Sequence, residues 1–488
     1  MAGGTLRGAP AGGGMLGVLG ELAAAASGHL LAGDPRQPIG GVAADTRAVR
    51  PGDLFCAIRG ERVDAHTLLG QAFAAGAAAV LVDRRPGDCW RLEEVPAGRG
   101  AIWVQGAVAA LGRLAARHLA GLDPVPPVVG ITGSVGKTGT RGLVAAALGG
   151  GGAAVLTPEA SFNTEVTVPL VCLRADRQRY VVLELAMRGP GQIAHLCRIC
   201  HPRVAVLTVI GQSHLELLGS QAAIVRAKGE LVAALPPDGR AILNADDPFQ
   251  AEIARRSPAP VLWYGVDHPA DVYAEGVRPA ADGYRFRAVF PDGVRQEVVL
   301  PLVGRHHVRN ALAALAAAWT LGVAPPVAAA GLAGIQPEAH RLVWTRAGRV
   351  YLLDDAYNAA PQSVLAALAT LGEVAADRPR AAVLGDMLEL GTATDAAHED
   401  VGRAAAATGL LWLVTVGPLA GGIARAAVAA GMEPGRVVGA QDRAGALARV
   451  EELLAASPDG TAVLVKGSRA LGLEEVAEAI TRWGQVPP

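Results

Sequence analysis

Residues 128–141, which read VVGITGSVGKTGTR, constrain the fold more than any other stretch of this chain. The apolar run at 128–131 predicts a buried strand, and it leads into a glycine-rich turn that ends in Gly136-Lys137-Thr138. A strand, a glycine turn and a helix N-terminus in this order form a phosphate-binding loop, because backbone N–H groups and the positive end of the helix then face an anion. The segment therefore predicts a nucleoside-triphosphate site.

The individual positions of this loop have distinct chemical uses. Lys137 would reach the outer phosphates, and Thr138 would offer its hydroxyl to Mg²⁺. The match to G-x-x-x-x-G-K-[ST] is incomplete, since Ile131 stands where the first glycine belongs and Gly130 lies one residue early. The strand before the loop still favours a nucleoside triphosphate. Four loop residues would present backbone N–H groups to it: Gly133, Ser134, Val135 and Gly136.

Length and charge favour a soluble enzyme of several domains. The 488 residues predict about three domains. The 44 Lys and Arg nearly balance the 45 Asp and Glu, so no basic field indicates nucleic acid as a partner. The uncharged stretch at 311–336 is long enough to span a bilayer, but Pro325-Pro326 interrupts it. We therefore expect a buried helix at 308–321, then a turn and a second short helix, with no membrane insertion.

The cysteines and the chain start give a consistent picture of the compartment. The first fourteen residues lack a compact apolar core, so we expect a frayed terminus and no signal peptide. Five scattered cysteines without an export signal predict reduced thiols in the cytoplasm. Residues 197–201 have the C-x-x-C-H spacing of haem attachment. Because such attachment needs export, we interpret residues 192–200 as an ordinary helix that ends before Pro202.

Alternating apolar strands and helical patterns run through three segments of the chain. The proline-rich linker at 123–127 separates the first segment, and a weaker boundary lies near 331–337. We therefore predict domains at 15–123, 124–335 and 336–488. Strands that alternate with helices imply parallel sheets flanked by helices, an α/β fold. The expected strands lie at 54–58, 78–82, 102–104, 128–131, 181–185, 204–209, 351–355, 381–384, 411–416 and 462–465.

Polar residues follow several of these strands, where parallel sheets bind their ligands. Glu184 ends one strand and Thr208 closes the next, while Asp354-Asp355 and Lys466-Gly467-Ser468 end strands of the last segment. Their convergence predicts a cleft between domains with nucleotide on one wall. Thr138 and Glu184 would suit one Mg²⁺ ion. Taken alone, His214 would more often be structural, and Lys228 would be a solvated helix lysine.

The combination of motifs resembles the Mur ligase superfamily. The segments that carry this resemblance begin with TGSVGKT, the Glu184 strand, Ser213-His214-Leu215-Glu216 and Lys228. Others are Asp45-Thr46-Arg47 with residues 51–55 and 60–66, Gly304-Arg305-His306 with Asn310-Ala311, Asp354 to Ala359, residues 385–391 and residues 465–469. Together they extend over roughly residues 15–485.

The resemblance implies a central P-loop parallel-sheet ATPase domain, a small α/β N-terminal domain for the UDP-sugar, and a Rossmann-like C-terminal domain. It implies ATP-driven amide formation with two Mg²⁺ ions. The branch that it most resembles joins D-alanyl-D-alanine to a UDP-N-acetylmuramoyl-tripeptide, in cytoplasmic synthesis of cell-wall precursors. In the family, the lysine that matches Lys228 is carbamylated and binds the second Mg²⁺ beside His214. We expect a monomer.

Further site residues follow from the resemblance alone. Asn310, Arg341 and Asp355 would hold the adenine, phosphate or ribose of ATP. Thr167 stands where the family usually has glycine, and the helix after the loop carries Gly139 and Gly142, each costing about 1 kcal/mol against alanine. The implied substrate-binding residues are Asp45, Thr46, Arg47, Asp64, His66, Asn163, Thr164, Tyr357, Asn358, Lys466 and Ser468.

Three alternatives remain open from the sequence. A sister ligase could add diaminopimelate or lysine to the dipeptide precursor, but its Asp-Asn-Pro-Arg signature is absent, and Tyr357-Asn358-Ala359-x-Pro361 favours the D-alanyl-D-alanine branch. A folylpolyglutamate synthase is the second alternative. A non-catalytic nucleotide-binding module is the third, and it would require loss of a phosphate or metal ligand.

Overall fold

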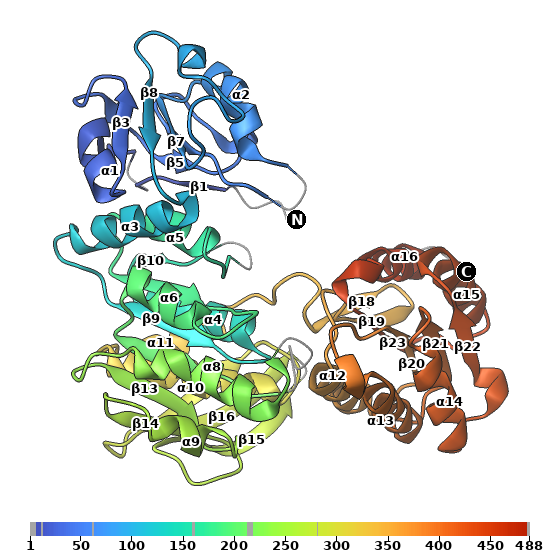
Figure 1. Cartoon of the computed structure of the whole chain (residues 1–488). Coiled ribbons are helices and arrows are strands. Elements are labelled where there is room, and N and C mark those ends of the chain that lie inside the picture. Colours follow the sequence, from blue (N-terminus) through green and yellow to red (C-terminus); the bar gives the residue numbers. More distant parts are fainter. Residues whose placement is uncertain are drawn as a thin grey trace.

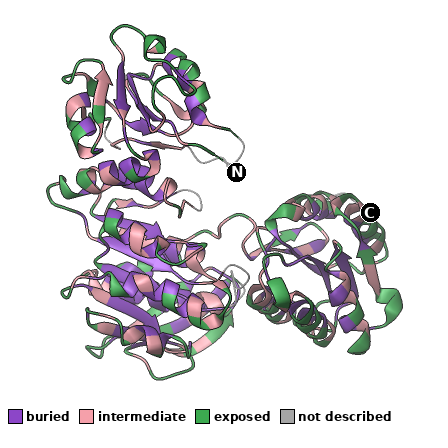
Figure 2. Ribbon diagram, viewed as in Figure 1, coloured by how far each residue is buried: buried purple, intermediate pink, exposed green. Residues whose placement is uncertain are grey.

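The computed structural model describes residues 6–10, 13–60, 63–158, 162–211, 218–280 and 282–485. Three large sheets follow one another along the chain, and helices pack on them (Figure 1). Buried strands run through the middle of each part, and exposure increases toward the outer helices (Figure 2). The α/β class predicted from the sequence is confirmed.

The first sheet has six strands in the order β1-β5-β6-β7-β8-β3. Its four central strands are parallel, while β1 and β3 pair antiparallel at the two edges. A small antiparallel pair, β2 with β4, lies beside it. The elements are β1 (Arg7–Gly8), β2 (Gly17–Val18), α1 (Leu19–Ala25), β3 (His29–Ala32), β4 (Pro38–Ile39), β5 (Val42–Ala43), β6 (Leu54–Cys56), α2 (Leu69–Ala74), β7 (Ala79–Val82), β8 (Gly100–Trp103) and α3 (Ala107–Ala120).

Strand β1 corrects the expectation that the first fourteen residues are frayed. Arg7 and Gly8 pair with β5, and the Arg7 guanidinium donates to both carboxylate oxygens of Asp53, at 2.6 and 2.8 Å. Asp53 is fully buried, and a buried carboxylate needs a charged partner. The long-range ion pair therefore orders a segment whose local sequence favours disorder.

Helix α3 lies at the junction between the first and second parts of the molecule (Figure 1). It packs against α1 on one side and against α5 and α6 on the other. Its buried residues, among them Leu111 and Leu114, belong to one hydrophobic core that continues from the first sheet into the second. The predicted boundary at 123–124 therefore follows a helix that serves both parts.

The second sheet has nine strands in the order β10-β11-β9-β12-β13-β14-β15-β16-β17, parallel as far as β15 and antiparallel from there. Its strands are β9 (Val128–Thr132), β10 (Val155–Leu156), β11 (Tyr180–Glu184), β12 (Val204–Leu207), β13 (Arg240–Asn244), β14 (Val261–Gly265), β15 (Val272–Ala280), β16 (Gly283–Val289) and β17 (Arg295–Leu300). Its helices are α4 (Lys137–Gly149), α5 (Thr167–Cys172), α6 (Gln192–Cys200), α8 (Gln221–Ala233), α9 (Gln250–Ala254), α10 (His306–Thr320) and α11 (Pro325–Ala333).

Helix α10 is the central support of this part. Alanine dominates its sequence, and all residues from 310 to 318 are buried, so the helix packs closely against α4, α11 and the strands β13 to β15. The predicted pair of helices separated by Pro325-Pro326 is confirmed. Within the described residues, no helix combines the length and hydropathy that a membrane span requires.

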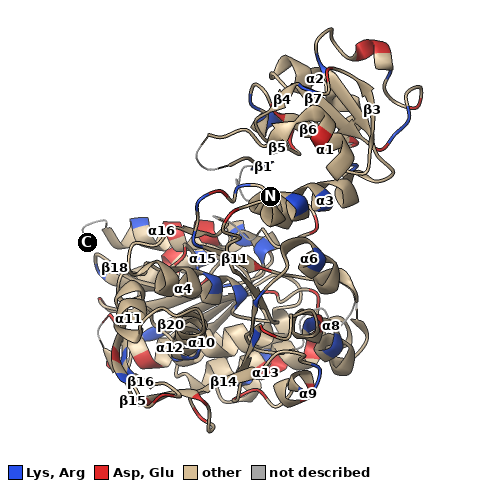
Figure 3. Cartoon of the chain, turned by 90° about the vertical axis from the view of Figure 1, so that its left-hand side faces the viewer, with Lys and Arg blue, Asp and Glu red and all other residues tan. Residues whose placement is uncertain are grey.

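The third sheet has six strands in the order β18-β19-β23-β20-β21-β22, parallel except for the β18–β19 hairpin. Its elements are β18 (Val343–Ala347), β19 (Val350–Asp354), α12 (Pro361–Val374), β20 (Arg380–Gly385), α13 (Thr394–Ala407), β21 (Trp412–Val416), α14 (Gly421–Ala429), β22 (Val437–Ala440), α15 (Arg443–Ala455), β23 (Ala462–Lys466) and α16 (Glu474–Gln485). The segment 334–342 connects this part to α11. In the view of Figure 3, basic and acidic residues alternate over all three parts.

Candidate active site

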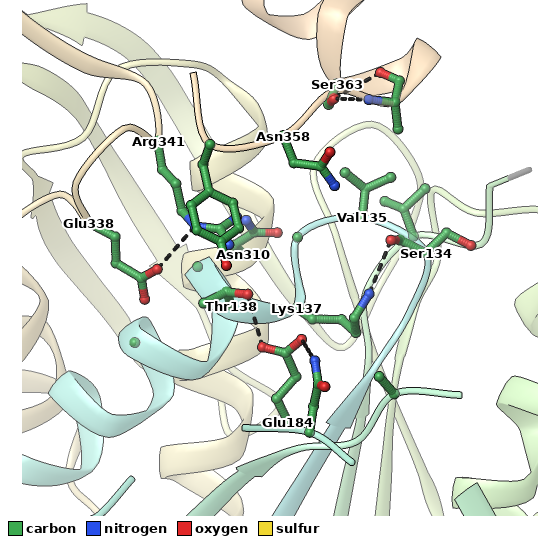
Figure 4. A pocket seen from close by; sticks show the side chains of 18 of the residues that line it. Ser134, Val135, Lys137, Thr138, Glu184, Asn310, Glu338, Arg341, Asn358 and Ser363 are labelled. Carbon is green, nitrogen blue, oxygen red and sulfur yellow. Dashed lines mark hydrogen bonds and ion pairs between the residues drawn. The ribbon is translucent and has the colours of Figure 1, made fainter. Parts of the chain in front are cut away.

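A pocket with a volume of about 1250 Å³ lies where the second and third parts face each other. The P-loop lines one wall, and the opposite wall includes Arg341, Leu342, Lys466 and several residues between 355 and 366 (Figure 4). Ile58, Arg59 and Val108 extend it to the first part. The pocket therefore has residues from all three parts of the chain, as expected for a cleft between domains.

Hydrogen bonds attach the P-loop to residues 208 and 209, which follow the neighbouring strand β12. The Thr208 hydroxyl donates to the carbonyl of Val135 at 2.6 Å, and Ser134 N–H donates to the carbonyl of Val209 at 2.7 Å. A Cβ on Gly133 would lie 1.9 Å from the Thr208 hydroxyl oxygen, so only glycine fits here. Gly136 caps α4 with φ of 87°, a left-handed conformation that glycine adopts without strain. These contacts and the two glycines define the conformation of the loop.

Lys137 lies at the pocket wall and bends back over the loop. Its ammonium donates to the carbonyls of Gly133 and Ser134 at 2.9 and 3.1 Å. Burial lowers the pKa of Lys137, Glu184 opposes this shift, and the Arg341 guanidinium adds to it. Lys137 and Arg341 both line the pocket. Anions between two such cations would stabilise the charged form of both.

Glu184 is the acidic centre of the P-loop wall. It is 2% exposed, one carboxylate oxygen accepts from the Thr138 hydroxyl at 2.9 Å, and the other accepts from the Asn163 amide at 2.9 Å. Both bonds are visible in Figure 4. The structure thus brings together three residues that the sequence analysis assigned to metal or substrate.

Lys228 is buried, with 1% exposure, and is not the solvated lysine that its helix position alone suggests. Its ammonium donates to the Gly133 carbonyl at 2.8 Å. Burial lowers the pKa of Lys228 far below its usual value, and the nearby Lys137 lowers it further. Both influences disfavour the charged form of the amine. His214, the expected partner of Lys228, lies outside the described residues.

On the opposite wall, Arg341 is held from two sides. Its guanidinium stacks over the Tyr357 ring, 4.0 Å from the centroid, and its Nε forms an ion pair with Glu338 at 3.2 Å. Glu338 also pairs with Arg141 of α4, with 3.0 Å between Oε1 and the guanidinium. Figure 4 shows Arg341 facing the P-loop across the pocket.

A buried ion pair forms part of this wall. The Lys466 ammonium contacts the Asp355 carboxylate at 2.5 Å and donates to the Asn358 carbonyl at 2.8 Å. Burial raises the pKa of Asp355, and Lys466 opposes that shift. Asn358 and Lys466 line the pocket, whereas Ser468 is buried behind it and accepts from Leu388 N–H at 3.0 Å. Of the residues in this part that were predicted to bind the substrate, Ser468 therefore does not face the pocket.

Asn310 lies beside the P-loop on α10. It is 6% exposed, and its amide lies 3.4 Å from where a Cβ of Gly136 would be. A Cβ on Gly139 would lie 3.8 Å from His307, so Gly139 keeps the first turn of α4 open to the pocket. Gly142 faces Glu338 in the same way, at 3.7 Å. These helix glycines therefore lie where α4 borders the site.

The residues predicted for the UDP-sugar lie apart from this pocket, in the first part. Asp45 caps the short helix that begins at Thr46 and pairs with Arg47, whose side chain is 83% exposed. His66 is buried: its Nδ1 contacts Asp64 at 2.6 Å, and its Nε2 accepts from Asp83 N–H at 3.2 Å. In this structure His66 has no free ring nitrogen for a ligand and instead orients Asp64.

Thr167, which replaces the usual family glycine, forms a reciprocal cap with Thr164. Thr164 N–H donates to the Thr167 hydroxyl at 3.0 Å, and Thr167 N–H donates to the Thr164 hydroxyl at 3.3 Å. These reciprocal bonds hold the turn that leads into α5. The helix predicted at 192–200 is confirmed as α6, and Cys197 and Cys200 are buried in it.

Sequence reasoning missed residues that support the loop from behind. The buried Asp247 accepts from Ile210 N–H at 2.7 Å, and Gln250 donates to the carbonyl of Thr208. The polar residues that begin at Asn244, the last residue of β13, were the sequence signal that could have identified this support. His306 and His307 also line the pocket, and burial lowers the pKa of both, that of His307 to about 4. The chain has only three lysines, at 137, 228 and 466. Lys137 and Lys466 line the pocket, and Lys228 contacts the P-loop at Gly133.

The chain matches three family models in order along its length. They are the Mur ligase family catalytic domain at residues 38–119, the Mur ligase middle domain at 131–318 and the Mur ligase glutamate ligase domain at 340–469. A UDP-N-acetylmuramoyl-tripeptide–D-alanyl-D-alanine ligase of Mycobacterium tuberculosis is 38% identical, over 91% of this chain and 92% of that protein.

Solved structures agree with the sequence comparison. A MurF crystal structure from Acinetobacter baumannii superposes with a TM-score of 0.84 at 29% identity, covering 96% of this chain and 99% of that one. MurF ligase from Thermotoga maritima in complex with ADP gives a TM-score of 0.78 at 27% identity, covering 91% and 97%. The resemblance seen in the sequence is confirmed, and the chain belongs to the Mur ligase family.

Proposed function

We propose that this chain joins D-alanyl-D-alanine to a UDP-N-acetylmuramoyl-tripeptide at the expense of ATP, a step of peptidoglycan precursor synthesis on which cell shape and division depend. The relatives that share 34–38% identity over about nine-tenths of the chain carry this activity in their names. The tripeptide carboxylate takes the γ-phosphoryl group, giving an acyl phosphate and ADP. The amine of the dipeptide then displaces phosphate and forms the amide.

One observation carries the proposal: the pocket gathers cations on both walls around a space for anions. Lys137 lies on the P-loop wall and Arg341 on the opposite wall, close enough to lower the pKa of Lys137. A carboxylate and a triphosphate repel each other, so their reaction needs positive charge at the transferring phosphoryl group. In this proposal, Asn310 and Asp355 would hold the adenosine as the two walls approach. Exclusion of water protects the acyl phosphate from hydrolysis.

The P-loop wall offers donors suited to Mg²⁺. Thr138 supplies a hydroxyl and Glu184 a carboxylate, both hard oxygens of the kind that Mg²⁺ prefers. Two ions would neutralise the phosphate oxygens. The second would be held by His214 and by Lys228 as a carbamate, since an ammonium has no lone pair to offer a cation. The buried position of Lys228 and the lowered pKa of its amine support this assignment.

We assign the three parts of the chain to three ligands. Residues 15–123 would bind the UDP-sugar through Asp45, Thr46, Arg47 and Asp64, with ATP on residues 124–335. Residues 336–488 would bind the dipeptide and part of ATP. The tripeptide would extend along Asn163 and Thr164 toward the phosphate, and Tyr357, Asn358 and Lys466 border the space left for the dipeptide. We propose a cytoplasmic monomer.

Phosphate release tests this function directly. The purified chain is assayed with ATP, Mg²⁺ and a panel of UDP-muramyl peptides, each with D-alanyl-D-alanine, D-glutamate or diaminopimelate as the amine. We expect turnover only with the tripeptide precursor and D-alanyl-D-alanine. Turnover with the dipeptide precursor and diaminopimelate would instead indicate a sister ligase.

A further inference from the structure

We propose that His340 is a positioning residue that, together with Glu338, fixes Arg341 toward the nucleotide, and that Ala339 between them is the pivot of the two walls. This inference rests on the proposed function, because it concerns how the ligase presents a cation to ATP. It is carried by four contacts in residues 338–342, none of which involves the reacting groups themselves.

Glu338 connects Arg341 to the P-loop side of the pivot. Its carboxylate pairs with Arg141 of α4, whose side chain is 6% exposed. Because α4 begins at Lys137, this ion pair attaches the linker to the helix that carries the phosphate loop. An ion pair with one buried member is held more strongly than an exposed pair.

His340 belongs to the opposite side. Its Nδ1 contacts the Asp354 carboxylate at the end of β19 at 2.8 Å, and its carbonyl accepts from Tyr357 N–H at 3.1 Å. Both partners belong to the third part of the molecule. Residues two positions apart are thus bonded to different parts, which leaves the exposed Ala339 as the place where the backbone turns.

The backbone on either side of Arg341 is unusual. His340 has φ of 59° and Leu342 has φ of 51°, so both have left-handed conformations that side chains rarely adopt. Such conformations persist only where surrounding contacts hold them. Here the contacts are the His340–Asp354 bond and Leu342 N–H, which donates to Asp355 at 3.2 Å. The result is that Arg341 points from this turn onto the Tyr357 ring and toward Lys137.

The decisive variant is His340→Gly. Glycine keeps the left-handed backbone without strain but removes the bond to Asp354, so the fold should remain while Arg341 loses its fixed direction. We expect the KM for ATP and the Kd for ADP, measured by calorimetry, to rise about fivefold to tenfold, because small misplacements of a positioned group have large effects. The KM for the UDP-precursor should stay within about twofold, since that site is remote. His340→Asn should restore most of the loss, because asparagine tolerates this backbone and can donate to Asp354.

Two comparisons separate positioning from general damage. His201→Gly is the matched control: His201 is exposed, has φ of 46° and caps α6 away from the pocket, so its nucleotide affinity should equal that of the wild type. In an Arg341→Ala background, His340→Gly should change the Kd for ADP no further. Wild-type affinity in His340→Gly, or an undiminished effect in the Arg341→Ala background, would overturn the proposal. ADP binding can be measured even if the ligase assay identifies a different amine substrate. The proposed function and the proposed role of His340 can therefore be refuted independently.

Discussion

The two walls of the pocket both carry cationic side chains but are built in different ways. The P-loop wall comes from consecutive strand ends of one sheet, where Gly133, Thr208 and Glu184 lie within bonding distance of their neighbours. The opposite wall combines Arg341 and Lys466, which are far apart in the sequence and are held by ion pairs and by stacking on Tyr357. The first wall is set by backbone geometry, and the second by side-chain partners.

Because the walls are built differently, substitutions on them should reduce activity for different reasons. On the P-loop wall, a side chain can be removed while the loop keeps its shape, so the loss of activity reports the chemical role of that side chain. On the opposite wall, removing one side chain changes the orientation of the side chain that it pairs with, so the loss of activity reports how that second side chain is positioned. The following predictions test that distinction, from the largest expected effect to the smallest.

Lys137→Ala should reduce turnover at least about 10³-fold, because a cation at the transferring phosphoryl group is lost. Among the described residues, its ammonium bonds to two loop carbonyls, so the melting temperature should change little. Ligase rate and thermal unfolding are measured side by side. More than a tenth of the wild-type rate would refute the assignment of this loop.

Lys228→Ala should reduce turnover about 10²-fold or more, and short carboxylic acids should restore part of it by supplying the missing oxygens. Removing CO₂ from the buffer should lower wild-type activity reversibly. Because the chain has only three lysines, mass spectrometry after chemical trapping of the carbamate can assign the site directly. Full activity of the variant would show that this buried lysine is structural.

Arg47→Ala should raise the KM for the UDP-precursor about tenfold and leave the KM for ATP nearly unchanged. The side chain is exposed and its partner in this structure is Asp45, in a part of the chain separate from the P-loop. Steady-state kinetics with each substrate varied in turn decides this. An equal rise in both constants would contradict the division of ligands among the three parts.

Tyr284→Phe should have the smallest effect. The Tyr284 hydroxyl on β16 donates to Glu373 on α12, a bond between the second and third parts. Its loss should cost about 1 kcal/mol in the association of these parts. We expect a lower melting temperature by a few degrees with kcat within about twofold. A tenfold loss of kcat would mean that this bond, and not the linker, sets the orientation of the opposite wall.

Much of the fold was predictable from local pattern. The strands at 128–131 and 181–185 and the helices at 192–200 and 308–321 lie where apolar periodicity placed them, because each buries a continuous apolar face. The strand at 7–8 was missed because the buried Asp53, forty-six residues later in the sequence, is what holds Arg7 in place. The hairpin β18–β19 was only half predicted, since the exposed residues of β18 give no alternation to detect.

The sequence by itself determined the phosphate loop, the acidic residue at the end of the next strand and the family, because these depend on residue types at fixed spacing. Only the tertiary structure decided that Lys228 is buried against Gly133, that His66 is enclosed and Arg47 exposed, and that Glu338 and His340 are bonded to different parts of the molecule. Burial and ion pairing arise from residues distant in the chain. The local sequence therefore does not determine which charged side chains form ion pairs.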